Sequence, residues 1–368
     1  MTVRANKPAF SIREKLKELE RPIGLKGSEL MRAETAQEAR DLVSAGRRNL
    51  IINGRFDFWQ RGTSFTGDEY TADRWRQARS GGTSTVSRQS FTLGQTEVPG
   101  NPVYYLRQSC SVGNGNCGIN QPIEDVRTGA GGPVTVSFWS KGTNPPGYGY
   151  WAMQLWQRFG SGGSPSGNVQ NNKELTVTSD WKKYTFTYEL NSVAGKTLGT
   201  NNDHKLDLII RQHESDNNTG AWELNLANVQ VELGKNATEF EHRSYGEELA
   251  LCQRYYEKLS SNDGAGGYAT LCKGSKASNT VILLEPVFRV PKRAPGATMS
   301  WSGSFRFGGV AGLSGISLSS INNAQLGTHG GYIVMVISSN SNPPNGGDGY
   351  RFEGDGDTSA YIAFLSEL

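Results

Sequence analysis

The chain has 368 residues, among them 46 glycines, and its 38 basic and 35 acidic residues give a formal net charge of +3. This near balance argues against a general nucleic-acid-binding protein, which normally presents a strongly basic face. The glycine content, together with many threonine, serine, asparagine and aromatic residues, favours an all-β protein over a helical bundle, and the mean hydropathy of −0.53 is compatible with many turns.

The N-terminus lacks the apolar segment of a signal peptide, and no apolar run approaches the ~18 residues that span a membrane. We therefore expect synthesis in the cytoplasm and no membrane insertion.

The four cysteines form neither a disulfide framework nor a C-x-x-C motif, so we expect no bound metal. Cys110 and Cys117 flank a predicted hairpin tip. Their spacing is compatible with a disulfide, but two thiols are favoured.

Residues 1–48 are charged, glycine-poor and predicted to be helical. Capping boxes at residues 11–14 and 35–38 predict the starts of two helices. The apolar residues along these helices are Ile12, Leu16 and Leu19 in the first and Leu42 and Val43 in the second. Neither helix can bury its apolar side within this segment, so both must pack on the following domain or on other chains. We favour other chains, either in a trimer or in a socket on a larger particle.

Residues 49–243 are predicted to form a β-sandwich of the jelly-roll type. Residues 49–52 are predicted to be its first strand, followed by the turn signal Asn53-Gly54. A strand at residues 104–111 is expected to end at the hairpin tip. The apolar residues of segment 134–138 alternate with polar ones, as in a strand with one buried face.

Two tryptophans in the first part of this region have two possible roles. Trp59 and Trp75 could lie on a sugar-binding surface, or in the sandwich core with neighbouring arginines stacked on them. We favour the core.

Residues 244–260 are predicted to form a linking helix. A third capping box at residues 244–247 opens it, and Leu249, Cys252, Tyr256 and Leu259 share one side. Residues 261–368 are again β-like and glycine-rich, and their strand spacing predicts a second, smaller β-sandwich. The predicted fold class is therefore mainly β, with a short N-terminal helical arm, a central sandwich, a linking helix and a C-terminal sandwich.

Three segments carry a resemblance to a known family. They read NLIINGRFDFWQRGTSF…YTADRW at residues 49–75, VQVELGKNATEFEHRSYGEELALCQRYYEK at 229–258, and YIAFLSEL at 361–368. Together they resemble bacteriophage tail-fibre and related virion-fibre proteins. Residues 24–51, GLKGSELMRAETAQEARDLVSAGRRNLI, resemble the attachment end of fibres in some short-tailed marine phages.

The resemblance implies a homotrimeric fibre located in the virion. Its N-terminus would attach to phage tail or adaptor proteins, its central jelly roll would be similar to a carbohydrate-binding module, and its distal end would meet a host-surface polysaccharide. We expect no cofactor and, from the charge balance, no nucleic-acid partner. Residues 77–221 match no motif, so the resemblance places no binding surface.

Saccharide binding needs aromatic faces for sugar C–H groups and planar polar side chains for hydroxyls. The candidates on one side of a predicted strand are Tyr150, Gln154, Trp156 and Arg158, opposite the core residues Trp151, Met153, Leu155 and Phe159. This row could instead form an intersubunit contact or lie under a loop. The distal candidates are Tyr332, Asn345, Asp348 and Tyr350.

Catalysis is poorly supported, because the chain has neither a G-x-S-x-G elbow nor an H-E-x-x-H motif. Asp355-Gly356-Asp357 could contribute to calcium binding, but a solvated turn is favoured. We therefore predict a non-enzymatic fibre. The alternatives are a capsid (head) fibre, a decoration or connector protein, and a polysaccharide depolymerase.

Overall fold

The computed structural model describes residues 48–169, 172–212, 220–263, 265–278, 280–308, 317–339 and 350–368. The two predicted N-terminal helices, with Ile12, Leu16, Leu19, Leu42 and Val43, lie outside the described residues. Asn345 and Asp348 do so as well. The fold class is mainly β, as predicted, with one α-helix among the described residues.

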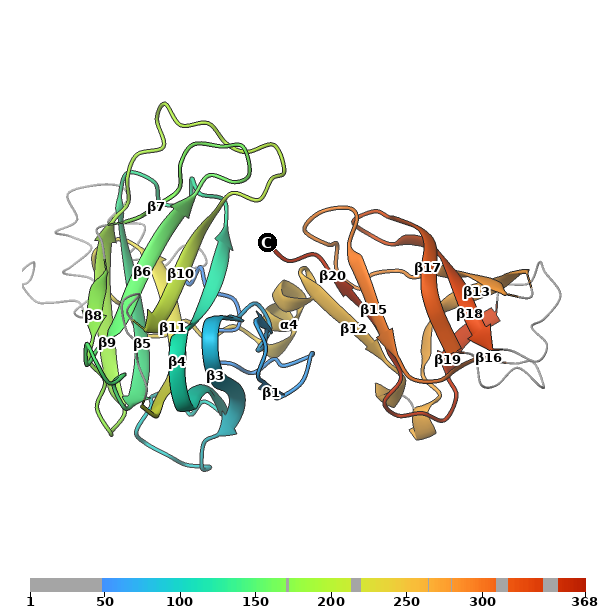
Figure 1. Ribbon diagram of the computed structural model, residues 1–368, viewed down its shortest axis with the longest axis horizontal. Helices are drawn as coiled ribbons and strands as arrows, with labels where there is room; N and C mark the ends of the chain where they lie inside the picture. The colour runs from blue at the N-terminus through green and yellow to red at the C-terminus, as the bar shows by residue number, and fades with distance from the viewer. Residues whose placement is uncertain are drawn as a thin grey trace, which may run out of the picture.

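The first β region forms the larger body in Figure 1. Its strands are β1 (Ser64–Phe65), β2 (Glu69–Tyr70), β3 (Arg76–Ser90), β4 (Tyr104–Glu124), β5 (Pro133–Gly142), β6 (Trp151–Arg158), β7 (Gly167–Asn168), β8 (Lys173–Leu175), β9 (Lys182–Glu189), β10 (Lys205–Gln212) and β11 (Trp222–Leu233). They form one 11-stranded sheet whose main path runs β7-β6-β10-β4-β11-β5-β9.

This sheet folds into two layers because β4 belongs to both. Residues 118–124 of β4 pair with β10, whereas residues 106–110 pair with β11. β3 pairs with β4 along most of its length. Figure 1 shows β6 and β10 in one layer and β5 and β11 in the other, which is the sandwich that the sequence predicts.

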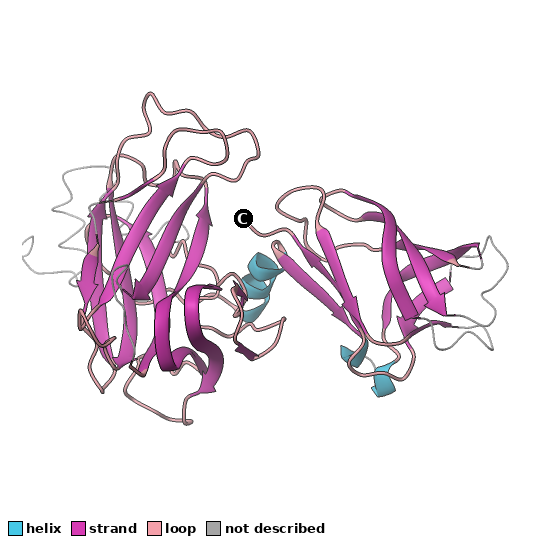
Figure 2. Ribbon diagram, viewed as in Figure 1, coloured by secondary structure: helices cyan, strands magenta, loops and turns pink. Residues whose placement is uncertain are grey.

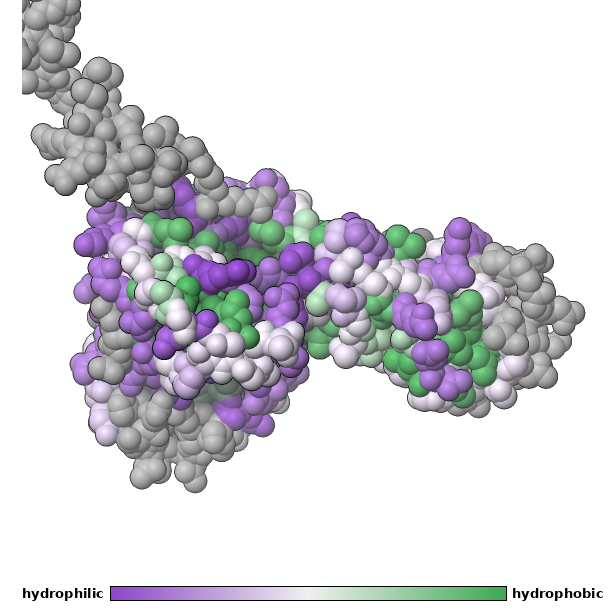
Figure 3. All heavy atoms as spheres, turned by 90° about the horizontal axis from the view of Figure 1, so that it is seen from above, coloured by the Kyte–Doolittle hydropathy of each residue, from purple (hydrophilic) through white to green (hydrophobic). Residues whose placement is uncertain are grey.

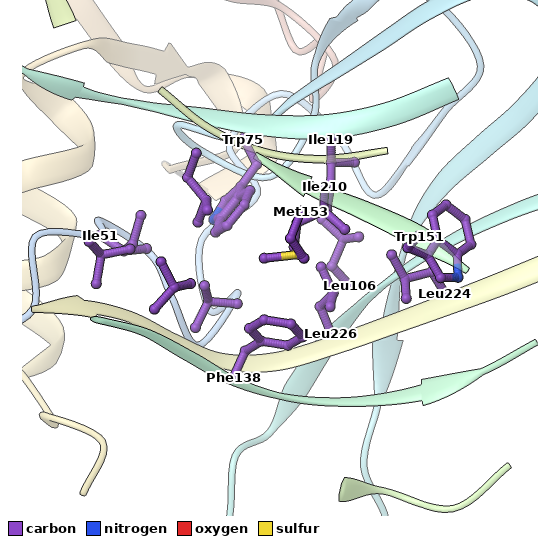
Figure 4. Packing of buried hydrophobic residues seen from close by; sticks show 14 of the residues in the cluster. Ile51, Trp75, Leu106, Ile119, Phe138, Trp151, Met153, Ile210, Leu224 and Leu226 are labelled. Atoms are coloured by element: carbon purple, nitrogen blue, oxygen red, sulfur yellow. The ribbon is translucent and has the colours of Figure 1, made fainter. Parts of the chain in front are cut away.

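A core of apolar side chains fills the space between the layers (Figure 4). Met153 and Ile210 come from β6 and β10, Phe138 and Leu226 come from β5 and β11, and all four are fully buried. The other inward-facing residues predicted for β5 lie in the same core. Burying each such side chain contributes about 1.5–3 kcal/mol, so the two layers stabilise each other.

β4 corrects one prediction, because it is a single strand of 21 residues with no hairpin tip after residue 111. Cys110 and Cys117 therefore lie seven positions apart in one strand, about 23 Å at 3.3 Å per residue. A disulfide needs Cα atoms within about 7 Å, so these two residues are not joined. The pairing with β3, which places Gly81 opposite Gly115, overrides the turn preference of the glycines.

Residues 49–52 form no strand, contrary to the prediction. The side-chain oxygen of Asn49, which is buried, accepts a hydrogen bond from the N–H of Val231 at 3.1 Å. The side chain thus replaces the backbone acceptor for Val231, and a single backbone bond, from the N–H of Leu50 to the carbonyl oxygen of Val231 at 2.8 Å, joins this segment to Val231. Next to it, a Cβ atom at Gly54 would lie only 2.2 Å from the carbonyl oxygen of Val229, so this position requires glycine.

The turn at Asn53 is as predicted, and it fixes a buried tryptophan. Asn53 has a φ of 57°, and its carbonyl oxygen accepts a hydrogen bond from Nε1 of Trp75 at 3.2 Å. Trp75 and Trp59 are both buried, which confirms the core position. The predicted stacking of a neighbouring arginine on them is wrong for Arg74, whose guanidinium lies 3.5 Å from the ring centroid of Tyr255.

The second β region contains nine strands in two sheets. They are β12 (Tyr256–Ser260), β13 (Thr270–Ser278), β14 (Val281–Glu285), β15 (Thr298–Ser302), β16 (Phe305–Gly308), β17 (Ser317–Leu326), β18 (Gly331–Ser339), β19 (Tyr350–Gly354) and β20 (Tyr361–Leu365), with the 3-10 helices η1 (Ser261–Asp263) and η2 (Ala265–Gly267). The sheet orders are β12-β20-β15 and β16-β19-β13-β14-β18-β17. Both sheets contribute to a second core that includes Ile333 and Phe364.

The helix α4 (Tyr245–Gln253) lies between the two groups of strands (Figure 2). Ser244 forms the predicted capping box at its start. The predicted extent of residues 244–260 is wrong, because the chain continues as β12 and pairs with β20. This pairing explains the early end of the helix, and it also places the ring of Tyr256 3.7 Å from the guanidinium of Arg61 in the first β region.

The two β regions lie side by side and meet at a narrow junction (Figures 1 and 3). Glu367 near the C-terminus forms ion pairs with Arg61, at 3.0 Å, and with Arg74. The hydroxyl of Tyr70 donates a hydrogen bond to the backbone oxygen of Leu368 at 3.0 Å.

On the face in Figure 3, hydrophobic residues gather in separate patches among polar ones. None of the described helices is long and apolar enough to cross a membrane.

Candidate functional site

β6 turns one row of side chains into the core and the other row outward. The inward residues, which lie in the first core as predicted, are Trp151, Met153 and Leu155. Gln154, Trp156 and Arg158 point the opposite way, because successive residues of a strand alternate between its faces. Trp156 and Arg158 are half-buried, whereas Gln154 is buried.

Neighbouring strands place polar residues beside this outward row. Asp207 of β10 and Asn168 of β7 lie on the two sides of Trp156 in register. Asn120 of β4 is paired with Ile209 of β10, which is itself opposite Gln154. These side chains therefore share one face of the sheet. We call this surface the β6 face, and its members are Gln154, Trp156, Arg158, Asn120, Asp207, Asn168 and Asn172.

Hydrogen bonds among amide side chains hold the indole of Trp156 in place. Its Nε1 donates to Oε1 of Gln154 at 3.1 Å. Nε2 of Gln154 donates to Oδ1 of Asn172 at 2.5 Å, and the same oxygen accepts a bond from Nδ2 of Asn168 at 3.2 Å. This chain of bonds fixes the edge of the ring, so that the ring is preorganised as a contact surface.

A second set of contacts orients Arg158. Its Nε donates to Oδ2 of Asp207 at 2.8 Å, and Oδ1 of Asp207 accepts a hydrogen bond from Nδ2 of Asn120 at 3.0 Å. The guanidinium carbon of Arg158 lies 4.9 Å from the ring centroid of Trp156, a distance typical of a cation–π contact. The β6 face thus combines one aromatic ring, one ion pair and several amides.

Two side-chain oxygens of the β6 face have unused acceptor capacity. Oδ1 of Asn120 and Oδ1 of Asn168 are buried and have no hydrogen-bond partner in the part of the chain that the structure describes. Such atoms are uncommon, because leaving a buried acceptor unsatisfied costs about 1–3 kcal/mol. A ligand hydroxyl would satisfy either atom once the side chains that cover it shift, and the C–H groups of the ligand could pack on the ring of Trp156. This arrangement suits a polyhydroxylated ligand.

Tyr150, the fourth candidate in this row, lies outside the β6 face. It precedes β6 and stands six positions from Trp156, about 20 Å in an extended strand. Its half-buried ring instead lies 5.9 Å from that of Tyr148, which is exposed.

The distal candidates are not brought together among the described residues. Tyr332 is half-buried in β18, and Tyr350 begins β19. β14 and β13 lie between these two strands in the sheet, which separates them by about 14 Å. Asn345 and Asp348 lie outside the described residues, so the distal site stays a prediction.

Sequence reasoning missed the members of the β6 face that lie outside β6. Asp207 had a visible signal, because it is an outward acidic residue within the apolar alternation of KLDLIIRQ. Asn120, Asn168 and Asn172 had no comparable signal. Their place depends on which strands pair with β6 and in which register, and local patterns do not contain that information.

The acidic residue Asp357 stabilises a turn. Its carboxylate accepts hydrogen bonds from the hydroxyl of Ser359 at 2.6 Å, from the N–H of Ser304 at 3.0 Å and from the N–H of Ser359 at 2.8 Å, and these bonds lower the pKa of Asp357. Within the described ranges, no group of three or more His, Cys, Asp or Glu residues is placed to hold a metal ion.

No protein-family model and no curated protein matches the chain. Among solved structures, it is similar to the enzymatically active domain of tailspike protein 4 of bacteriophage CBA120, at 14% identity and a TM-score of 0.32 over 50% of this chain. The match covers about a fifth of that domain, 21% of its length.

Carbohydrate-binding modules are also among the similar structures. The family 11 module of the cellulase Lic26A-Cel5E of Clostridium thermocellum matches at 15% identity and a TM-score of 0.30, over 48% of this chain and 97% of the module. The CBM22-1 xylan-binding domain of Paenibacillus barcinonensis Xyn10C matches at 15% identity and a TM-score of 0.28, over 52% and 100%. Scores this low assign neither a family nor a function to the chain.

Proposed function

We propose that this chain is a structural fibre protein of a bacteriophage virion that binds a host-surface glycan through the β6 face and catalyses no reaction. The binding role is supported by one observation: the preorganised ring of Trp156 shares a sheet face with the buried, unsatisfied oxygens of Asn120 and Asn168. The fibre role is supported by the resemblance of residues 49–75, 229–258 and 361–368 to phage tail-fibre proteins.

The contents of the β6 face favour binding over cleavage. Glycosidases generally use two carboxylates, about 5–10 Å apart, on either side of the scissile bond. Asp207 is the one carboxylate among the seven members of the β6 face, and Arg158 and Asn120 occupy both of its oxygens. Incubation with host polysaccharide is therefore expected to release no new reducing ends, and clear turnover would favour a depolymerase.

Replacing Trp156 with alanine is expected to weaken glycan binding by about tenfold or more, because a preorganised tryptophan is a typical binding hot spot. Affinity electrophoresis of the full chain through gels that contain different polysaccharides measures the change. Trp139→Ala is the matched control, since Trp139 is a half-buried tryptophan of β5 in the other layer. Equal losses in both variants, or no loss in Trp156→Ala, would contradict the assignment to the β6 face.

The fibre role also predicts assembly through residues 1–48. Light scattering is expected to give the mass of three copies of the 40.1 kDa chain, and deletion of residues 1–48 is expected to give a monomer. Multivalency would then raise the avidity of weak individual sites. A monomeric intact chain would overturn the trimer, and a trimer that survives the deletion would place the assembly contacts elsewhere.

A further inference from the structure

Lys205 is a charged residue at the border of the β6 face. It is the first residue of β10, and it lies opposite Arg158 of β6 on one side and Glu124 of β4 on the other. Because Asp207 is two positions further along the same strand, both side chains point to the same face. Lys205 is half-buried.

Each carboxylate near Lys205 is already engaged by another group. Asp207 binds Arg158 and Asn120, as described above. Glu124 forms an ion pair with Nη2 of Arg254 at 3.2 Å. Asp203 accepts hydrogen bonds from the N–H and hydroxyl of Ser161.

In the part of the chain that the structure describes, Lys205 itself forms no ion pair and no side-chain hydrogen bond. The surroundings of Lys205 destabilise the charged form of its side chain. Burial is the main cause of a lowered pKa at Lys205. The attraction of Asp207 and Asp203 raises this pKa, and the positive charges of Arg158 and Arg74 lower it. An anion bound at this point would offset that imbalance.

We propose that Lys205 and Arg158 together bind the carboxylate of an acidic sugar unit, so that the ligands of the β6 face are acidic polysaccharides. The inference rests on the proposed glycan-binding function and adds the class of ligand. Arg158 uses Nε for Asp207, and its remaining guanidinium nitrogens belong to a side chain that is 36% exposed. The guanidinium also lies over Trp156, so a carboxylate on a sugar packed against that ring would reach both cations.

The test compares acidic polysaccharides with the same polymers after their carboxylates have been reduced to hydroxymethyl groups. The probes are polygalacturonate, alginate, hyaluronate and polysialic acid, each in both forms, and the protein is the full chain. We expect binding to at least one acidic polymer, with a loss of about tenfold or more after carboxyl reduction. Added salt is expected to weaken binding to the acidic form more than to the reduced form.

Variants test the role of Lys205. Lys205→Met is expected to reproduce the roughly tenfold loss on the acidic polymer and to leave binding to the reduced polymer unchanged. Lys205→Arg, which keeps the charge, is expected to retain most of the affinity. Lys183→Met is the matched control, since Lys183 is an exposed lysine of β9 at the far edge of the sheet. Thermal unfolding of each variant checks that it is folded, and Lys205→Gln replaces Lys205→Met if that variant is not.

The possible failures are distinct. Equal binding to the acidic and reduced forms would overturn the acidic ligand class and leave glycan binding intact. A requirement for the carboxylate with no effect of Lys205→Met would overturn the role of Lys205. Absence of binding to every polymer in both forms would overturn this inference, and failure of Trp156→Ala to alter binding to any glycan would overturn the proposed function separately.

Discussion

Replacing Arg74 with alanine is expected to lower the free energy of unfolding by about 3–5 kcal/mol. Arg74 is 1% exposed, it forms an ion pair with Glu367, and its Nη2 donates to the carbonyl oxygen of Pro122 at 2.7 Å. Its guanidinium also packs on the ring of Tyr255 at 3.5 Å. The variant would leave a buried acceptor unsatisfied and the carboxylate of Glu367, whose side chain is 5% exposed, with Arg61 as its remaining cation.

Arg76→Ala is a matched control for this prediction, because it removes the same side chain two positions away. Arg76 forms an ion pair with Asp68 at 2.6 Å, but these side chains are 39% and 45% exposed. Exposed pairs contribute about 0–1 kcal/mol, so the control is expected to be close to wild type. Urea denaturation measures both variants. If Arg74→Ala were as mild as Arg76→Ala, the junction between the two β regions would contribute little to stability.

Arg74→Lys separates the charge of this residue from its shape. Lysine keeps the positive charge but loses the planar fork that binds a carboxylate and a carbonyl oxygen and packs on an aromatic ring. An intermediate loss of stability is therefore expected. Full recovery in Arg74→Lys would assign the whole effect to charge.

The faces of individual strands could be predicted from the sequence, but their partners could not. Alternation within β5 and β6 assigned Phe138 and Met153 to the core, and Trp156 to the outward face. That alternation depends only on neighbouring residues. It found three of the seven members of the β6 face, because the other four come from segments that only the tertiary structure brings next to β6.

The errors in the predicted elements share one physical cause, contacts between distant parts of the chain. β4 continues through its glycines because β3 pairs with it on one side. Residues 49–52 form no strand because the side chain of Asn49 binds Val231, 182 positions away. The helix α4 ends early because β12 pairs with β20, about a hundred residues later. Where such contacts exist, the local preference of a segment for helix or strand predicts its secondary structure poorly.

The buried ion pair of Lys292 and Glu257 predicts the second large effect. Nζ of Lys292 lies 2.5 Å from Oε2 of Glu257 and donates to the carbonyl oxygen of Gln253 at 2.6 Å, and both charged side chains are 0% exposed. Lys292→Met would leave Glu257 buried beside Arg289, which is 4.0 Å away and 56% exposed. We expect a loss of about 3–5 kcal/mol, measured by chemical denaturation.

A double variant, Lys292→Met with Glu257→Leu, separates the cost of an isolated charge from the contribution of the pair. It is expected to recover most of the loss, because well-packed apolar residues often replace a buried pair without destabilisation. If the double variant lost as much as Lys292→Met, the cost would come from packing.

The pH dependence of Glu257→Gln tests the same pair from the side of the lysine. Burial already lowers the pKa of Lys292 in the wild type, and removing the carboxylate of Glu257 lowers it further. The unfolded chain, in which a lysine has a pKa of about 10.4, then binds more protons than the folded chain, so folding stability rises with pH. The deficit of Glu257→Gln is therefore expected to shrink as the pH rises from neutrality toward the pKa of a lysine in the unfolded chain. A deficit that stays constant over this range would mean that the charge of Lys292 is not its cause.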